Sequence, residues 1–371
     1  MKKLALILIL CIFLYPNISY SIETTPSPLV NSVSGTFNHG NYITITGGGF
    51  GTKSHANPVV WAPFEEGKAA ADSNLSSGTL ITNYRVDATS QYNGRSKYNV
   101  SNVAKTDGVK TAADLRTQIN SNKFFVFARR KFPANLFQNV SNFKTFWAWP
   151  NLLGCTNNSK PYANMIFDYM NGKMNVTYQG GAGAPGGGQI LPVGPVIDSG
   201  EWVTWEIQEK KGTVDNYDGS LKWWENSILK VSSTPKNVTT DYPTDTYCTI
   251  LFQDFWTETV AGKSYLNNAK DYLDDVYMDD TWSRVMIGNA STFNACTHRE
   301  PLIPTEWSNT SITAYFNQGS FPNGSKVYLF VVDSNGNASP GKEIAIGGTA
   351  SAGDAPKPTV NPNPPVNLNI N

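Results

Sequence analysis

The sequence predicts an all-β protein in which one β-sandwich is inserted into another. Apolar and polar residues alternate along most of the chain, which is the pattern of half-buried strands. Aromatic residues are abundant at 12%, charged residues are scarce at 16%, and 31 glycines and 22 prolines supply turns. Two turn-rich β segments lie far apart in the sequence, and neither has enough strands to bury a hydrophobic face alone.

Residues 1–21 have the pattern of a cleavable signal peptide. Lys2 and Lys3 precede an apolar stretch, and Ser19 and Ser21 place small residues where a signal peptidase would cleave, after Ser21. The apolar stretch is too short to span a bilayer comfortably. We therefore expect a secreted or periplasmic protein without membrane insertion.

The two β segments at the ends are predicted to form one domain in two parts, residues 22–57 and 287–349. In the first part, Ile43 to Thr46 are alternating β-branched residues that run into a glycine-rich bend. In the second part, three short alternating runs between 311 and 341 are separated by Asn-Gly turns. We expect Ile43 to Thr46 to lie in the same sandwich as Val327 to Val332.

These two segments also resemble the two ends of an IPT/TIG immunoglobulin-like domain. The similarity to the start of that domain lies in Ser32–Gly35, His39-Gly40 and Gly47–Gly51. The similarity to its end lies in Trp307-Ser308, Ser311–Thr313, Gly324, Val331–Asp333 and Gly336. The resemblance implies an immunoglobulin-like β-sandwich, which is split by whatever lies between its halves.

Residues 58–286 are too many for a loop, because long connections without structure of their own are uncommon. We predict a second, inserted domain there, built almost entirely of strands, with one possible helix at Thr111 to Asn120. The clearest strands are Lys123 to Phe132, Asn142 to Trp149, Met165 to Tyr169, Lys173 to Tyr178, Glu201 to Glu209, Gly219 to Glu225 and Tyr272 to Met278.

Three phrases of the inserted domain resemble concanavalin A-like lectin and glucanase domains. Glu201 to Trp205 and Asp218 to Trp224 look like their paired central strands, and Tyr272 to Tyr277 looks like their closing strand. The resemblance implies a jelly-roll β-sandwich whose closing strand returns beside the first one, at Val59 to Trp61. Such an arrangement brings the two ends of the domain together, as an insertion requires.

Three cysteines follow the leader, and an odd number allows at most one internal disulfide. Cys155 and Cys248 are the expected pair because both fall inside the inserted domain, whereas Cys296 is expected to be free. The three histidines show no spacing typical of a zinc site or of a Cys/His dyad.

The charge balance argues against nucleic acid as a partner. The chain has 29 basic and 29 acidic residues, so it lacks the basic surface that nucleic-acid binding requires. Residues 350–371 are rich in proline and asparagine and are predicted to be a disordered tail. The sequence does not indicate an oligomeric state.

A ligand-binding groove is predicted on two consecutive strands of the inserted domain. Trp147 and Trp149 should share one strand face, and indole rings bind the apolar side of sugar rings. Arg129 and Lys131 should share a face of the preceding strand, where they could bind acidic groups of a glycan. The alternative interpretations are that the tryptophans belong to the core and that the two cations end a strand in water.

The predicted function is binding of an extracellular polysaccharide or surface glycan, for adhesion or substrate retention, without catalysis. One alternative is a polysaccharide lyase, in which a cation neutralises a uronate carboxylate and a Tyr or His accepts a proton. Another is a purely structural surface or appendage module. A hydrolase is disfavoured, because the segment with Asp275 and Asp279 on one face contains no Glu and matches the closing strand.

The resemblance to jelly rolls also implies a structural Ca²⁺ that ties the first strand to the last. Its ligands would be Glu65, Glu66, Asp274 and Asp275, since calcium prefers carboxylate and backbone oxygens. The alternative is that these four are ordinary charges at a sheet edge.

Overall fold

The computed structural model describes residues 27–64, 80–82, 85–87, 99–103, 113–149, 165–170, 173–178, 189–192, 200–213, 216–236, 246–259 and 270–350. These residues are almost all in strands or turns, with one four-residue helix, α1 (Leu136–Asn139), and one 3-10 turn, η1 (Phe293–Ala295). Within these ranges no helix is long and apolar enough to cross a membrane. The predicted signal peptide and the predicted tail beyond Ala350 lie outside them.

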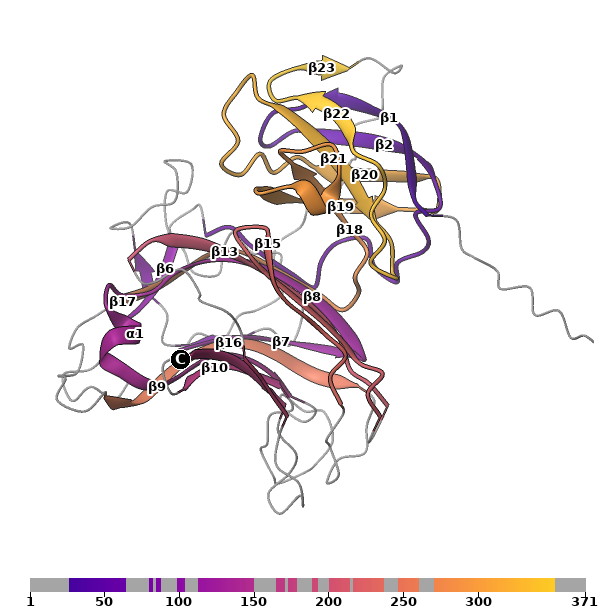
Figure 1. Cartoon of the computed structure of the whole chain (residues 1–371). Helices are drawn as coiled ribbons and strands as arrows, with labels where there is room; N and C mark the ends of the chain where they lie inside the picture. The colour runs from indigo at the N-terminus through magenta and orange to yellow at the C-terminus, as the bar shows by residue number, and fades with distance from the viewer. Residues whose placement is uncertain are drawn as a thin grey trace, which may run out of the picture.

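One eight-stranded unit, here called the terminal sandwich, contains both ends of the described chain (Figure 1). Its strands follow the order β22-β21-β18-β19-β20-β2-β1-β23. Their bounds are β1 (Leu29–Thr36), β2 (Tyr42–Gly48), β18 (Arg284–Gly288), β19 (Arg299–Trp307), β20 (Ser311–Tyr315), β21 (Lys326–Val332), β22 (Lys342–Ala345) and β23 (Thr349–Ala350).

The pairing of β2 with β20 joins the two halves of this unit. Ile43 lies opposite Ala314, and Ile45 lies opposite Ile312, in an antiparallel register. Both isoleucines are buried in one hydrophobic core with Val327 and Leu329 of β21. The all-β fold class, with one sandwich inserted into another, is therefore confirmed.

The glycine-rich bend after β2 has a steric reason. A Cβ atom at Gly47 would lie 1.9 Å from the Leu29 carbonyl oxygen and 2.6 Å from the Phe50 ring. No side chain fits there, so glycine allows β1 and the buried Phe50 to approach β2 closely.

The intervening chain forms the inserted sandwich, whose two sheets we call proximal and distal by their position relative to the terminal sandwich (Figure 1). The proximal sheet has the order β15-β14-β13-β8-β17-β6-β5, with β3 paired to β17. Its strands are β3 (Val60–Ala62), β5 (Arg85–Asp87), β6 (Asn99–Val103), β8 (Lys123–Lys131), β13 (Trp202–Lys210), β14 (Ser220–Glu225), β15 (Ile228–Ser233) and β17 (Lys270–Asp279).

The distal sheet lies on the far side of the molecule and has the order β12-β11-β10-β9-β16-β7-β4. Figure 1 shows both sheets bowing towards the terminal sandwich, so the outer face of the distal sheet is concave. Its strands are β4 (Leu80–Thr82), β7 (Ala113–Ser121), β9 (Val140–Trp149), β10 (Met165–Met170), β11 (Lys173–Tyr178), β12 (Gln189–Pro192) and β16 (Tyr247–Thr259).

Aromatic side chains fill the space between the two sheets. Trp205 and Trp223 of the proximal sheet lie 5.1 Å apart between ring centroids, and both contact Phe167 of the distal sheet. Burial of each such ring contributes about 2–3 kcal/mol through the area removed from water. These contacts hold the distal sheet at a fixed place on the proximal one.

The predicted strand pairings of the inserted sandwich are found. β13 pairs with β14 from Trp205 to Lys210, and Tyr277 and Met278 of β17 lie opposite Trp61 and Val60 of β3. The first and last strands of the insertion are therefore neighbours, as an insertion requires.

Two predictions about elements are wrong. The possible helix at Thr111 to Asn120 is strand β7, in which Leu115 and Ile119 face the core. A spacing of four residues suits one face of either a helix or a strand, so it did not distinguish them. The predicted domain boundary at residue 286 falls inside β18, where Val285 and Ile287 belong to the core of the terminal sandwich.

Candidate functional site

Arg129 is buried at the interface between the two sandwiches and is not part of a glycan groove. Its guanidinium donates to Asp275 at 2.6 Å and to Glu300 of the terminal sandwich, and no part of its side chain reaches solvent. The outer face of the proximal sheet is covered here, because Phe125 and Phe127 pack on the same interface. The predicted binding role of Arg129 is therefore wrong.

Glu300 is stabilised in its ionised form at this interface, although it is buried. Burial acts to raise its pKa, but the Arg129 charge and a 2.8 Å contact with His298 outweigh burial and hold the pKa at about 2. The carboxylate stays ionised, and the three groups form a fixed ion-pair network.

The predicted calcium site fits poorly where the structure describes it. Glu65 and Glu66 lie outside the described residues. Asp275 already accepts from the Arg129 guanidinium, and Asp274 is buried and accepts from the Asp275 backbone N–H at 2.9 Å. A calcium ion on Asp275 would have to replace Arg129, so the described half of the site does not fit the ion.

The predicted groove is not formed, because its two strands belong to different sheets. β8, with Lys131, pairs with β13 and β17 in the proximal sheet, whereas β9, with Trp147 and Trp149, pairs with β10 and β16 in the distal sheet. Lys131 alternates with the core-facing Arg130 and so lies on the outer face of the proximal sheet. The cations and the indoles are on opposite sides of the inserted sandwich.

Trp147 and Trp149 do face outwards from the distal sheet. Phe146 and Ala148, which alternate with the two tryptophans, point into the core. Both indoles are partly exposed, with ring centroids 5.6 Å apart and planes at 70°. The pairing of β9 with β10 shifts register next to Phe146, which turns Lys144 to the outer side as well.

The strand register aligns further side chains with Trp147. In antiparallel strands, residues directly opposite share a face with Cβ atoms about 4.5–5.5 Å apart. The resulting row crosses six strands as Arg116, Leu251, Trp147, Ile166, Thr177 and Ile190. A parallel row consists of Lys144, Asp168 and Asn175, and a third of Gln118, Thr249 and Trp149. We call these three rows together the distal face.

Asp168 is the buried carboxylate of the distal face. It is 1% exposed, lies opposite Lys144 and Asn175, and accepts from the Thr177 hydroxyl, whose Oγ1 is 3.1 and 3.2 Å from its two oxygens. Burial raises the pKa of Asp168 to about 6, although Thr177 and the Lys144 charge act to lower it. Sequence reasoning missed this residue; the available signal was a single Asp in an otherwise apolar strand, MIFDYM.

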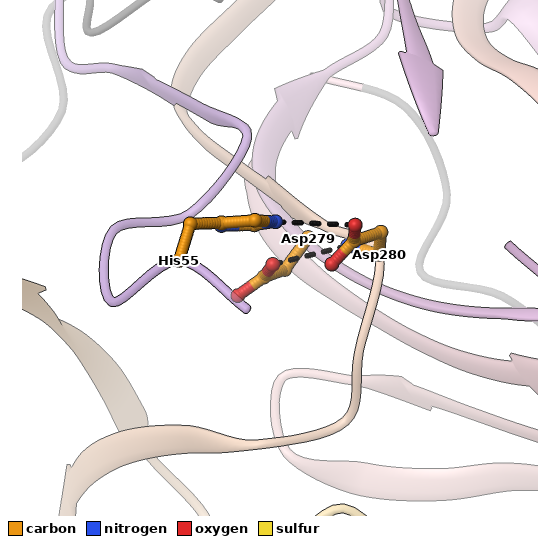
Figure 2. Close-up of side chains that lie close together, drawn as sticks. All are labelled: His55, Asp279 and Asp280. Carbon is orange, nitrogen blue, oxygen red and sulfur yellow. Dashed lines mark hydrogen bonds and ion pairs between the residues drawn. The ribbon is translucent and has the colours of Figure 1, made fainter. Parts of the chain in front are cut away.

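A second cluster contains His55, Asp279 and Asp280, shown in Figure 2. His55 Nε2 lies 3.1 Å from Asp280, and that hydrogen bond, against the effect of burial, raises the pKa of His55 to about 9. Lys53 donates to Asp279 at 2.6 Å and to the Ala56 carbonyl at 3.0 Å. Because an ammonium already binds the buried carboxylate, this cluster is an ion-pair network rather than a metal site.

Ser320, His298 and Glu300 on the terminal sandwich superficially suggest a nucleophile, a base and an orienting acid. Both Ser320 Oγ and Glu300 Oε1 lie 2.8 Å from the same atom, His298 Nε2. A catalytic triad uses one imidazole nitrogen for each partner. The arrangement is therefore a hydrogen-bond cluster that supports the Glu300–Arg129 pair.

Among the cysteines, Cys248 is disulfide-bonded and Cys296 is a free, buried thiol. The predicted partner of Cys248, Cys155, lies outside the described residues. That pairing stays a prediction.

No protein family and no curated protein matches the sequence. Solved structures that are similar in part include an endo-β-1,4-glucuronan lyase from the fungus Trichoderma reesei (14% identity, 62% of this chain and 97% of that one, TM-score 0.41). Others are an alginate lyase from Aplysia kurodai (10%, 53% and 86%, TM-score 0.38) and a receptor binding domain (11%, 74% and 70%, TM-score 0.39).

Proposed function

We propose that the distal face binds an acidic polysaccharide. The observation that carries the proposal is the central row, in which the partly exposed Trp147 indole shares a sheet face with Ile190, which is 57% exposed, and with the cation Arg116 at the other end of the row. Indole and aliphatic groups suit the apolar faces of sugar rings, and a guanidinium suits a carboxylate. Lys144 in the neighbouring row adds a second cation to the same concave face.

Substitution of the indoles tests this proposal. Trp147→Ala together with Trp149→Ala should weaken binding of an acidic oligosaccharide about tenfold or more, because each lost stacking contact is worth about 0.5–1.5 kcal/mol. The fold should be retained, since both side chains are partly exposed. Calorimetric titration of the purified protein with oligouronates would measure the change.

Trp202→Ala is the matched control, because Trp202 is a partly exposed tryptophan of the proximal sheet, beside Tyr272. It should bind as tightly as the wild type. Unchanged affinity in the double variant of Trp147 and Trp149 would show that the glycan site is elsewhere.

A lyase acting on an acidic glycan is the second candidate for the same face. Its support is that the cations Arg116 and Lys144 could neutralise a uronate carboxylate, to which the Asn175 amide could donate a hydrogen bond; this makes the proton on the adjacent carbon easier to remove. A base would take that proton, and a carbon–carbon double bond would form as the carbon–oxygen bond at the next carbon breaks. The departing sugar oxygen would take up a proton from an acid or from water. Among the described side chains of the distal face there is no His or Tyr, since Tyr169 and Tyr178 point into the core.

An assay for unsaturated uronates separates the two candidates. If the protein is a lyase, incubation with polyuronate would form unsaturated uronates and the ultraviolet absorbance would rise. The variant Arg116→Ala would abolish this rise. A binding protein would retain the polymer without any absorbance change.

We further propose that the protein acts outside the cytoplasm. The support is the leader-like pattern of residues 1–21 and the disulfide at Cys248, since disulfides persist in oxidising compartments.

We also propose that the terminal sandwich is IPT/TIG-like and that the inserted one is concanavalin A-like. The first part of this proposal is supported by the pairing of β2 with β20 across the insertion, and the second by the pairing of β3 with β17, the first and last strands of the insertion. On this proposal the terminal sandwich is a structural support for the glycan-binding one.

A further inference from the structure

The third row of the distal face contains no charged side chain on the described strands. Its members are Gln118 of β7, Thr249 of β16 and Trp149 of β9. It lies beside the row that holds Arg116 and Trp147, two residues further along each strand, which is a distance of about 7 Å. Successive sugars of an extended polysaccharide that follows β16 could therefore lie on these two rows.

Four partly exposed side chains of the two rows form a rectangle around β16. Trp147 and Trp149 lie on β9 at one side, and Arg116 and Gln118 lie on β7 at the other. Two strand spacings, about 10 Å, separate the two sides. The β16 residues of both rows are buried, so a ligand would contact the four flanking side chains rather than β16 itself.

The two flanking side chains of the third row offer uncharged contacts. The Nε1 atom of Trp149 is buried, so the exposed part of this indole consists of ring carbons, which suit the apolar face of a sugar. Gln118 carries a primary amide, and no other described residue forms a hydrogen bond with it. An amide both donates and accepts, as sugar hydroxyls do. The third row is therefore suited to a neutral sugar.

We propose that the distal face prefers a polysaccharide in which a uronate adjoins a neutral sugar over a polymer of uronates alone. This inference rests on the proposed glycan binding. The carboxylate of the uronate would pair with Arg116. The neutral sugar would lie on the third row, with its hydroxyls at the Gln118 amide and its apolar face on the Trp149 ring.

A second uronate on the third row would have no cation for its carboxylate. Arg116 can form one bidentate pair. Lys144 is on the far side of the Arg116 row, five residues from Trp149 along β9, which is about 17 Å. The carboxylate would meet the Gln118 amide or the Trp149 ring carbons, and it would lose hydration without gaining an ion pair. A neutral sugar avoids this cost, so Gln118 and Trp149 determine the specificity of the third row.

The test is calorimetric titration of the full chain with three oligosaccharides of equal length. One contains only uronates, one alternates uronates with neutral sugars, and one is neutral. The wild type should bind the alternating ligand about fivefold more tightly than the oligouronate, which is the effect of one charge interaction near a solvated site. It should bind the neutral ligand most weakly, because that ligand has no carboxylate for Arg116.

Gln118→Lys should reverse the order of the two acidic ligands, because its ammonium can pair with a second carboxylate on the third row. Gln138→Lys is the matched control, since it adds the same charge at an exposed position of α1 and should keep the wild-type order. Gln118→Leu is the second variant. It should weaken binding of the alternating ligand about fivefold, through the loss of hydrogen bonds to the neutral sugar.

Equal affinities of the wild type for the two acidic ligands would overturn this inference alone, and so would a wild-type order of affinities in Gln118→Lys. Unchanged binding of the alternating ligand by Gln118→Leu would also overturn it. Absence of binding of all three ligands by the wild type would overturn the proposed function with it.

Discussion

At the scale of single residues, the partners of a buried carboxylate decide whether its charged form is stabilised. Glu300 is held ionised by Arg129, whereas Glu209 of β13 has two tyrosines as partners. The hydroxyls of Tyr178 and Tyr247 donate to its two oxygens at 3.0 and 2.9 Å, across the gap between the sheets. Burial raises the pKa of Glu209 well above 4.5, which favours its neutral form in the folded protein.

Glu209 should make the folded state less stable as the pH rises. Its pKa is higher in the folded state than in the unfolded one, so its contribution is complete below about pH 4.5 and is lost progressively above that value. Glu209→Gln resembles the neutral acid and should remove this loss. Urea unfolding at pH 5 and pH 8 would measure the difference in free energy of unfolding between variant and wild type.

The free energy of unfolding of Glu209→Gln, relative to that of the wild type, should be higher at pH 8 than at pH 5. A difference that is the same at both values would show that Glu209 is ionised in the folded state. Tyr178→Phe is a useful companion, because it removes one donor while it leaves the acid in place.

At the scale of elements, the sequence is sufficient to predict the strands but not which way their side chains point. Regular alternation along β9 places Thr145 with Trp147, yet Thr145 is buried and accepts from Arg130 in the core. The register shift beside Phe146 is set by the pairing with β10, which is information that β9 does not contain. The tryptophans were therefore predicted as site residues, while their neighbours Lys144 and Asp168 were missed.

The sequence also does not show whether a charged side chain of a strand is buried, and Arg129 is an example. Two adjacent arginines flanked by aromatics are compatible with a strand end in water or with a ligand site, and the sequence does not separate these. The buried ion pair forms because the fold brings Glu300, which lies 171 residues later in the sequence, into contact with Arg129.

Arg129→Met should destabilise the protein by about 3–5 kcal/mol, because it leaves Asp275 and Glu300 buried without their cation. Denaturant unfolding would measure the loss. Lys326→Met is the control, since Lys326 pairs with Glu343 at the surface, where the two side chains are 63% and 53% exposed. That variant should be nearly as stable as the wild type. Equal effects of the two substitutions would contradict the importance of the buried pair.

At the scale of the whole molecule, the interface between the sandwiches combines apolar packing with buried ion pairs. Phe125 and Tyr277 of the inserted sandwich pack with Met286 and Ile303 of the terminal one. Beside them, Arg299 of β19 pairs with Glu206 of β13 at 2.9 Å, as Arg129 does with Glu300. Separation of the units would expose these rings and break both pairs.

The full chain is therefore expected to unfold in one cooperative transition rather than as two independent domains. Scanning calorimetry with simultaneous tryptophan fluorescence would test this. Trp147 and Trp205 report on the inserted sandwich and Trp307 on the terminal one, so both methods should give the same midpoint. Two separated transitions would show that the interface contributes little.

The pairing of β2 with β20 has a consequence for the time at which the chain can fold. About 260 residues separate these strands, and synthesis at about 5–20 residues per second takes about 13–50 s to cover them. During that interval the β1–β2 hairpin exists without its partner, and the edge of β2 that later pairs with β20 is an open template for other chains. The inserted sandwich can form first, so the order of folding is the reverse of the order in which the two units begin along the chain.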